Sequence, residues 1–150
     1  MFGPEADNLG TLASCCTHLG KQYMDLRLRQ LGYNITPVQT QALQAISRAG
    51  REINQRELEQ AMRLKAPTVN GILGRLEEKG YILRRASPAD GRCRLVSLTE
   101  EGRAMVETFR SVLEEVNRVF LADLTREEEA QLRGLLLRIT ANLENEVNRA

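Results

Sequence analysis

The sequence predicts a mainly α-helical protein that carries one small β-hairpin. Three observations support this fold class. Apolar residues recur at steps of three and four over most of the 150-residue chain, which is typical of amphipathic helices. Residues 81–98 break this pattern with two short basic strand candidates around a cluster of turn residues. Positive charge is concentrated in the same region.

The first two helices are delimited by turn and cap residues. An apolar stripe runs through residues 8–31, with Leu9, Leu12, Cys16, Leu19, Tyr23 and Leu26 at helical spacing. Gly32 and Asn34 end this helix. Thr36 with Gln39 then forms a capping box, and Pro37 suits a first turn. The helix that follows stops at Gly50.

Two short helices are expected in the middle of the chain. Asn54 with Glu57 opens the first of them, and Pro67 starts the second, which ends at Gly80. At 100° per residue, one face of residues 67–79 carries only apolar side chains, which must face the core. These are Val69, Ile72, Leu73 and Leu76.

A β-hairpin follows directly. Residues 81–85 and 93–98 read as strands, and the segment from Ser87 to Gly91 supplies the turn. A short helix that offers a polar face, followed by a basic hairpin, is the order of a winged helix-turn-helix. In that fold the helix enters a DNA groove and the hairpin lies beside it.

Two long amphipathic helices complete the chain. Thr99 caps one of them, and Thr125 with Glu128 opens the last. A unit of this size cannot bury the apolar faces of all the terminal helices, so a second copy of the chain is expected to cover them. We therefore predict dimerisation helices at residues 1–34 and 104–150, around a DNA-binding lobe at residues 35–103.

The charge distribution supports a phosphate-binding surface. The net charge is only +1. Residues 63–98, however, hold eight basic and three acidic side chains, whereas residues 99–150 carry an excess of four acidic ones. An isolated charge run is more often a solvated face, but its coincidence with the helix and hairpin favours nucleic acid.

The candidate DNA contacts follow from the two elements. Asn70 can pair with adenine in a major groove, and Thr68 can contact a thymine methyl group or a phosphate. At the hairpin tip, Asp90 can orient Arg92 toward a minor groove. The full predicted set is Lys65, Pro67, Thr68, Asn70, Gly71, Arg75, Arg84, Arg85, Asp90, Arg92 and Arg94.

Gly71 and Gly74 are unusual on the exposed face of a helix. Each costs about 1 kcal/mol of helix stability relative to alanine. Close approach of the helix backbone to DNA would explain them, and drift at an unselected surface is the alternative explanation.

The residues from about Ile53 to Gly102 resemble the MarR family of bacterial winged-helix transcription regulators. The resemblance is carried by five groups of residues: Thr68-Val69, Arg75-Leu76-Glu77 with Lys79-Gly80, Asp90-Gly91-Arg92, Val96-Ser97-Leu98-Thr99, and Gly102. It implies a homodimer on a palindromic operator, usually a repressor, with residues 67–79 in the major groove and Arg92 in the minor groove. Gly71 and Gly74 depart from the family pattern, where many members carry larger polar residues.

The resemblance also implies regulation by a small aromatic or phenolic effector, bound between the dimer helices and the DNA-binding lobes. Candidate lining residues are His18, Tyr23, Met24, Met105 and Phe109, although each is more typical of a core or interface position. A thiol-based redox sensor that uses Cys15 or Cys16 is a second hypothesis. Cys16 lies on the apolar stripe, where a buried inert thiol is the default.

Other function classes are disfavoured. One histidine, three cysteines without framework spacing and no phosphate-binding glycine loop argue against an enzyme, a metal site and a secreted disulfide scaffold. No cofactor is expected. The N-terminus lacks signal-peptide features and no apolar run is long enough to cross a membrane, so a cytoplasmic location is expected. A winged-helix module that binds only protein remains an alternative.

Overall fold

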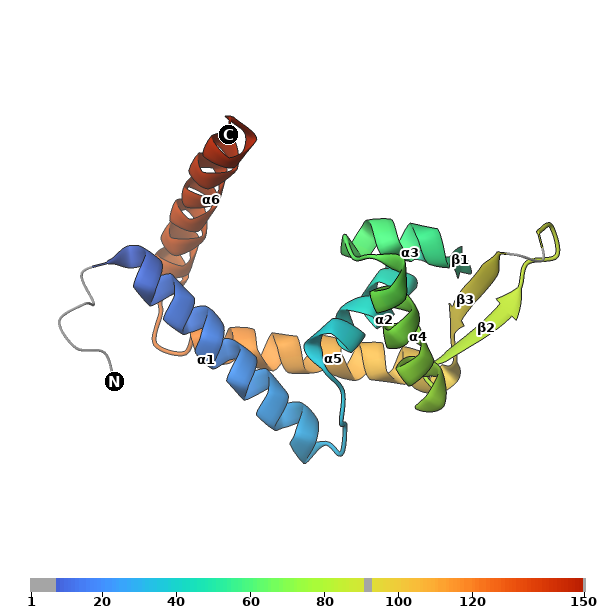
Figure 1. The fold of residues 1–150 in the computed structure, drawn as a ribbon. Helices are drawn as coiled ribbons and strands as arrows, with labels where there is room; N and C mark the ends of the chain where they lie inside the picture. The colour runs from blue at the N-terminus through green and yellow to red at the C-terminus, as the bar shows by residue number, and fades with distance from the viewer. Residues whose placement is uncertain (1–7, 91–92, 150) are drawn as a thin grey trace. The chain divides into compact units, whose positions relative to one another are not determined.

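A computed structural model describes residues 8–90 and 93–149, and its ribbon is drawn in Figure 1. The elements follow the order α1 (Leu9–Gln30), α2 (Pro37–Ala49), β1 (Ile53–Asn54), α3 (Gln55–Met62), α4 (Ala66–Glu78), β2 (Ile82–Ala86), β3 (Arg94–Leu98), α5 (Glu100–Phe120) and α6 (Arg126–Arg149). The mainly helical fold with a hairpin wing is therefore confirmed. The chain forms two compact units, Met1–Leu113 and Glu114–Ala150.

The predicted helix starts are present as hydrogen-bonded caps. Thr36 Oγ1 accepts from the Gln39 amide at 3.3 Å, and the Gln39 side chain accepts in return from the Thr36 amide at 3.2 Å. Asn54 and Glu57 form the same reciprocal pair, at 3.0 and 2.8 Å. These boxes satisfy amides that have no partner inside their helices, which explains why α2 and α3 begin where the sequence predicts.

The sheet has three antiparallel strands in the order β1-β3-β2. Ile82 pairs with Leu98 and Ala86 with Arg94 in the hairpin, while Ile53 pairs with Val96 on the other side of β3. The two-residue strand β1 was not predicted, because a pairing this short leaves no periodic pattern in the sequence.

The hairpin strands begin one residue later than predicted. Tyr81 belongs to the end of α4 instead of to β2, because its amide donates to the Leu76 carbonyl at 2.9 Å. Gly80 adopts the left-handed region at φ +76°, which closes the helix in the manner of a Schellman motif. Cys93, expected as the first residue of the second strand, instead donates its amide to the Asp90 carbonyl at 2.9 Å within the turn.

The core of the lobe lies where α2, α3 and α4 meet the sheet. The apolar face predicted for residues 67–79 is buried as expected, since Val69, Leu73 and Leu76 are fully inaccessible. Val96 of β3 and Met105 of α5 are also fully buried. This packing fixes α4 against the lobe and leaves its opposite face exposed.

Gly102 is required by close packing between α5 and the hairpin. A Cβ at this position would lie 2.0 Å from the Tyr81 carbonyl oxygen, which is backbone and cannot move aside. Thr99 reinforces the junction by accepting from the Gly102 amide at 3.0 Å and donating to the Gly80 carbonyl at 2.6 Å. The first turn of α5 is thereby fixed beside the start of β2.

The second unit consists of the end of α5 and α6. Thr125 and Glu128 form the predicted capping box, with bonds of 2.8 and 3.2 Å. No residue of α6 is buried in the single chain, although the helix carries seven large aliphatic side chains that are 41–75% exposed. They are Leu132, Leu135, Leu136, Leu137, Ile139, Leu143 and Val147.

Candidate nucleic-acid interface

The N-terminal half of α4 is an exposed polar surface. Lys65 precedes the helix as its N-cap residue without a side-chain cap bond, and Pro67 lies in the first turn. Thr68, Asn70 and Gly71 are exposed, and Arg75 is exposed further along the same helix. All six predicted contacts are therefore accessible. At 100° per residue, Pro67 and Gly71 lie opposite the buried apolar face, and Thr68 and Asn70 lie on its two flanks.

The two helical glycines leave open space on this surface. A Cβ added to Gly71 or to Gly74 would have no neighbouring atom within 4 Å. Packing inside the chain therefore does not require either glycine. The close-approach explanation, in which a partner comes within contact of the helix backbone, remains consistent with the structure.

The predicted hairpin cations differ in their partners. Within the described residues, Arg94 makes no ion pair, whereas Arg84 pairs with Glu77 at 2.5 Å and Arg85 pairs with Glu52. The Arg85 Nε atom also donates to Glu52 Oε1 at 2.8 Å. This hydrogen bond lowers the pKa of Glu52 and raises the pKa of Arg85. Two of the predicted cations are thus neutralised by internal carboxylates, which sequence spacing did not reveal.

Arg92, the predicted minor-groove residue, and Gly91 lie outside the described residues. Asp90 is exposed at the turn.

A polar groove lies between α3, the start of α4 and the hairpin. It encloses about 590 Å³. Arg56 from α3 and Arg94 from β3 both line this groove, together with Asn54, Gln55, Glu59, Ala66, Asp90 and Cys93. The guanidinium groups of Arg56 and Arg94 can bind an anion, and the carboxylates of Glu59 and Asp90 at the same groove offset part of their positive charge. Arg56 was not among the predicted contacts, since it precedes the basic segment in the sequence.

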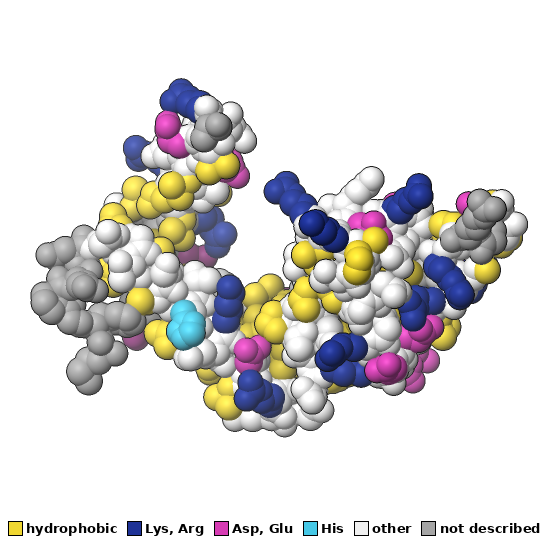
Figure 2. Space-filling view, viewed as in Figure 1, with side chains coloured by type: hydrophobic (Ala, Val, Ile, Leu, Met, Phe, Trp, Pro, Cys, Tyr) yellow, Lys and Arg dark blue, Asp and Glu magenta, His cyan; other side chains and the backbone are white. Residues whose placement is uncertain are grey.

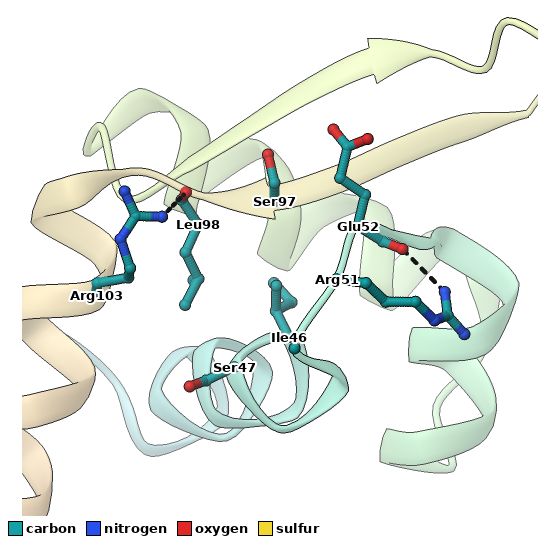
Figure 3. A pocket seen from close by; sticks show the side chains of 8 residues that line it. Ile46, Ser47, Arg51, Glu52, Ser97, Leu98 and Arg103 are labelled. Carbon is teal, nitrogen blue, oxygen red and sulfur yellow. Dashed lines mark hydrogen bonds between the residues drawn. The ribbon is translucent and has the colours of Figure 1, made fainter.

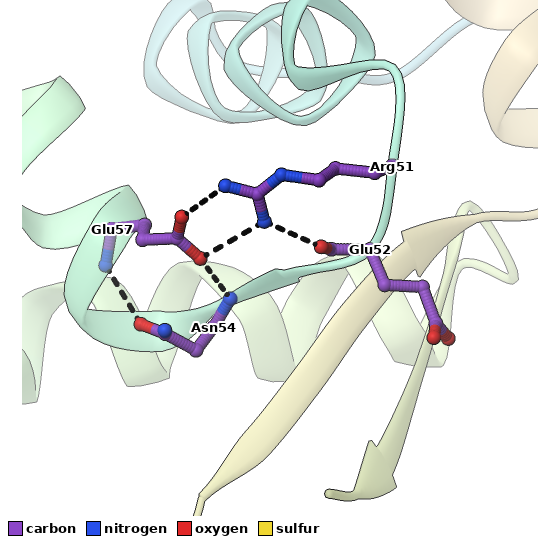
Figure 4. A network of polar contacts seen from close by, with 4 residues as sticks. All are labelled: Arg51, Glu52, Asn54 and Glu57. Atoms are coloured by element: carbon purple, nitrogen blue, oxygen red, sulfur yellow. Dashed lines mark hydrogen bonds and ion pairs between the residues drawn. The ribbon is translucent and has the colours of Figure 1, made fainter.

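The start of α3 is held by the network in Figure 4. Arg51 donates to the carboxylate of Glu57 at 2.5 Å and to the Glu52 carbonyl at 2.9 Å. The pKa of Glu57 is lowered first by its hydrogen bond with Arg51 and then by the bond from the Asn54 amide. The network fixes the loop that carries Glu52, and therefore the partner of Arg85.

A second hollow, shown in Figure 3, lies between the end of α2 and β3 and encloses about 320 Å³. Ile46 and Leu98 supply its apolar lining, and Arg51 and Arg103 line it as well. Both guanidinium groups donate to backbone carbonyls, those of Glu52 and Leu98. These arginines therefore already have acceptors within the lobe.

The five predicted effector residues do not line either of these hollows. Met105 is fully buried in the core, and Phe109, Tyr23 and Met24 are half-buried. His18 is exposed and forms a 3.0 Å hydrogen bond with Gln22 on the next turn of α1. The structure of the single chain thus does not gather these five side chains around one of the two hollows.

The accessibility of the cysteines differs from the expectation. Cys16 was expected to be buried on the apolar stripe of the first helix, but it is exposed in the single chain, and Cys15 is half-buried. The reason is that this stripe has no covering partner: Leu9, Leu19 and Leu26 are 51–73% exposed. Cys93 is half-buried beside the polar groove.

Residues 8–90 and 93–149 contain no group of three or more histidine, cysteine or acidic side chains that could hold a metal ion. None of the helices described is both long enough and apolar enough to span a membrane.

The space-filling view in Figure 2 shows lysine and arginine side chains spread over the lobe that carries α3, α4 and the hairpin. On α6, by contrast, hydrophobic side chains form a continuous stripe. The lobe therefore presents a surface suited to an anionic partner, and α6 presents one suited to an apolar partner.

The chain is similar to one protein family, to a curated relative and to several solved structures. A model of the MarR family matches residues 33–92. The uncharacterized HTH-type transcriptional regulator YdgJ of Bacillus subtilis is 34% identical over 97 residues, which cover 65% of this chain and 57% of that relative. The chain thus matches little more than half the length of this curated relative.

Solved structures match over most of the chain. A single-residue mutant of MepR from S. aureus is 28% identical with a TM-score of 0.79, over 91% of this chain and 98% of that one. Another MepR mutant, solved bound to an oligodeoxyribonucleotide, has the same identity and coverage with a TM-score of 0.69. A probable transcriptional regulator from Pseudomonas aeruginosa is 35% identical with a TM-score of 0.65, over 89% and 98% of the two chains.

Proposed function

We propose that this chain, which belongs to the MarR family of transcription regulators, acts by binding double-stranded DNA through α4 and the hairpin. The family's role is regulatory and not enzymatic. The main support for this proposal is the set of exposed cations around α4. Among them, Lys65, Arg75 and Arg94 make no ion pair within the described residues. Such cations can neutralise phosphates and release their counterions.

In this proposal α4 enters the major groove with its exposed N-terminal half. The hairpin tip, with Arg92, follows the adjacent minor groove, and Arg56 and Arg94 hold a phosphate at the groove between α3 and the hairpin. A MepR mutant has been solved bound to an oligodeoxyribonucleotide, which supports DNA as the partner of this chain. Because the target is chromosomal DNA, the protein acts in the cytoplasm.

We further propose a homodimer on a palindromic operator. The apolar stripes of α1 and α6 are largely exposed in the single chain, and a second copy would cover them. A two-fold dimer holds two recognition helices about one turn of DNA apart, roughly 34 Å. Operator half-sites should then be inverted repeats with that spacing.

Ligand-responsive repression completes the proposal. A small aromatic or phenolic effector would lower operator affinity by binding more tightly to a dimer whose recognition helices have a different spacing. A thiol-based response through Cys15 or Cys16 is the second candidate, and Cys16 lies on the α1 stripe that the second copy would cover. Oxidation requires an accessible thiolate.

Selection of bound duplexes from a random-sequence pool tests the proposed function. We expect enriched sequences that contain two inverted copies of one short motif, with centres about 10 base pairs apart. Single-stranded oligonucleotides of matched composition serve as the control and should not be enriched in this way. A single unpaired motif would contradict the dimeric operator, and absence of duplex binding even at low salt would favour a module that binds only protein.

A further inference from the structure

All three guanidinium nitrogens of Arg84 donate hydrogen bonds to side chains of α4. Its Nε and Nη2 atoms donate to Glu77 Oε2 at 2.8 and 2.5 Å, and its Nη1 atom donates to Asn70 Oδ1 at 3.1 Å. The Arg84 side chain is only 21% exposed. This arginine therefore bridges β2 to α4. Arg94, by contrast, is exposed and makes no ion pair within the described residues.

The bridge fixes the orientation of the Asn70 amide. A guanidinium group has five donor hydrogens and no acceptor, so the amide atom that faces Arg84 must be the oxygen. The amide NH2 group then points to the other side. Asn70 and Glu77 are separated by two helical turns and share one side of α4, which allows a single arginine to reach both.

Asn70 lies in the part of α4 that would face base edges. It is exposed in the first half of the helix, and recognition helices contact bases mainly through their N-terminal residues. Bidentate pairing with adenine requires the amide oxygen to accept from the base N6 atom while the NH2 group donates to N7. In this structure Arg84 donates to one lone pair of that oxygen at 3.1 Å, which fixes the plane of the amide and leaves the second lone pair available.

We propose that Arg84 is a positioning residue for base recognition, and that Glu77 anchors it. Together they fix the orientation of the Asn70 amide, so that its NH2 group is presented as a donor to base acceptors such as purine N7, guanine O6 or thymine O4. This inference rests on the proposed DNA-binding function. It assigns Arg84 to specificity, whereas the sequence suggested a direct phosphate or groove contact.

Two substitutions separate positioning from phosphate binding. Glu77→Gln removes the ion pair but keeps the Arg84 charge and both side-chain sizes. If Arg84 positions Asn70, selection from a random duplex pool should show that preference at one position per half-site falls about fivefold, the worth of one ordinary hydrogen bond. If Arg84 instead binds phosphate, Glu77→Gln should raise affinity for all duplexes and leave base preference unchanged.

Arg84→Met supplies the second readout, and Arg110→Met is its control, because Arg110 pairs with a glutamate of its own helix, Glu107 on α5. We expect Arg84→Met to relax the same position while the slope of affinity against salt stays that of the wild type. Arg110→Met should leave every base preference unchanged. Thermal melting verifies that each variant is folded, and Glu77→Gln alone decides the question if Arg84→Met does not fold.

The inference is overturned if Glu77→Gln leaves all base preferences intact, or if Arg84→Met lowers the salt slope by about one phosphate per protomer without altering preference. Failure of the proposed function has a different signature, because the wild-type chain would then enrich no duplex sequence at all.

Discussion

Replacing Gly71 with glutamate is expected to abolish operator binding while the chain stays folded. Gly71 lies on the exposed face of α4, and a side chain there would have no neighbour within 4 Å. The substitution therefore meets no clash inside the lobe, and loss of a helical glycine favours the helix by up to about 1 kcal/mol. At the DNA, however, the same carboxylate would be placed among phosphates and close to base edges.

We expect affinity for a selected operator to fall about 100-fold or more, since like-charge juxtaposition in an interface costs several kcal/mol. A mobility-shift titration measures this loss, and circular dichroism melting verifies that the fold is retained. Gly134→Glu is the matched control, because Gly134 is also a helical glycine with no neighbour within 4 Å, in α6. Undiminished operator affinity of the Gly71→Glu protein would refute the placement of α4 in the groove.

A glutamate at Leu143 should have the second large effect, by dissociating the dimer. Leu143 is 62% exposed in the single chain and lies on the apolar stripe of α6 with Leu132 and Ile139. A charged group buried in an apolar interface without a partner is strongly unfavourable. We expect sedimentation to show a monomer at micromolar concentration where the wild-type chain is a dimer.

Loss of the dimer should also weaken operator binding, because each half-site would then be bound separately and without the gain from linked binding, commonly 100-fold or more. Ala141→Glu provides the control. Ala141 is exposed on the opposite face of α6 at 100° per residue, and this variant should remain dimeric with normal affinity. If the Leu143→Glu protein stays dimeric, α6 is not the interface, and a monomeric wild-type chain would refute the homodimer itself.

The fold was largely predictable from sequence because local signals delimit most elements. The capping boxes at Thr36, Asn54 and Thr125 mark three helix starts, and the apolar face of α4 is readable from its spacing. These features depend on residues within one or two turns of each other. The two-residue strand β1 and the one-residue shift of the hairpin depend instead on pairing and capping bonds between separate segments.

The candidate interface was predictable in its location but not in its internal pairing. The basic segment and the exposed face of α4 follow from residue type and spacing. The Arg85–Glu52 pair joins residues 33 positions apart, and no local sequence pattern predicts it. Similarly, the hydrogen bond between Arg84 and Asn70 depends on how β2 packs beside α4. Both residues were predicted to contact DNA, and in the structure they also contact each other.

Long-range packing also explains what sequence reasoning missed. Arg56 precedes the basic segment, yet the fold brings it to the same groove as Arg94. The exposure of Cys16 reflects a stripe on α1 that the single chain leaves uncovered. A helical pattern predicts that a face is apolar, but it does not tell which molecule covers it.

The cations around α4 and the hairpin are proposed to hold a DNA duplex. The affinity of the purified chain for a random-sequence duplex, measured over a series of salt concentrations, tests this proposal. The wild type is compared with Arg75→Glu/Arg94→Glu and with Arg48→Glu/Arg138→Glu, a control with the same net charge on exposed sites of α2 and α6.

We expect wild-type affinity to fall steeply with salt, by a slope of about 0.9 for each phosphate neutralised. The Arg75/Arg94 variant should lose most of both affinity and slope, and the control should keep them. Equal affinity and slope in all three proteins would contradict the account.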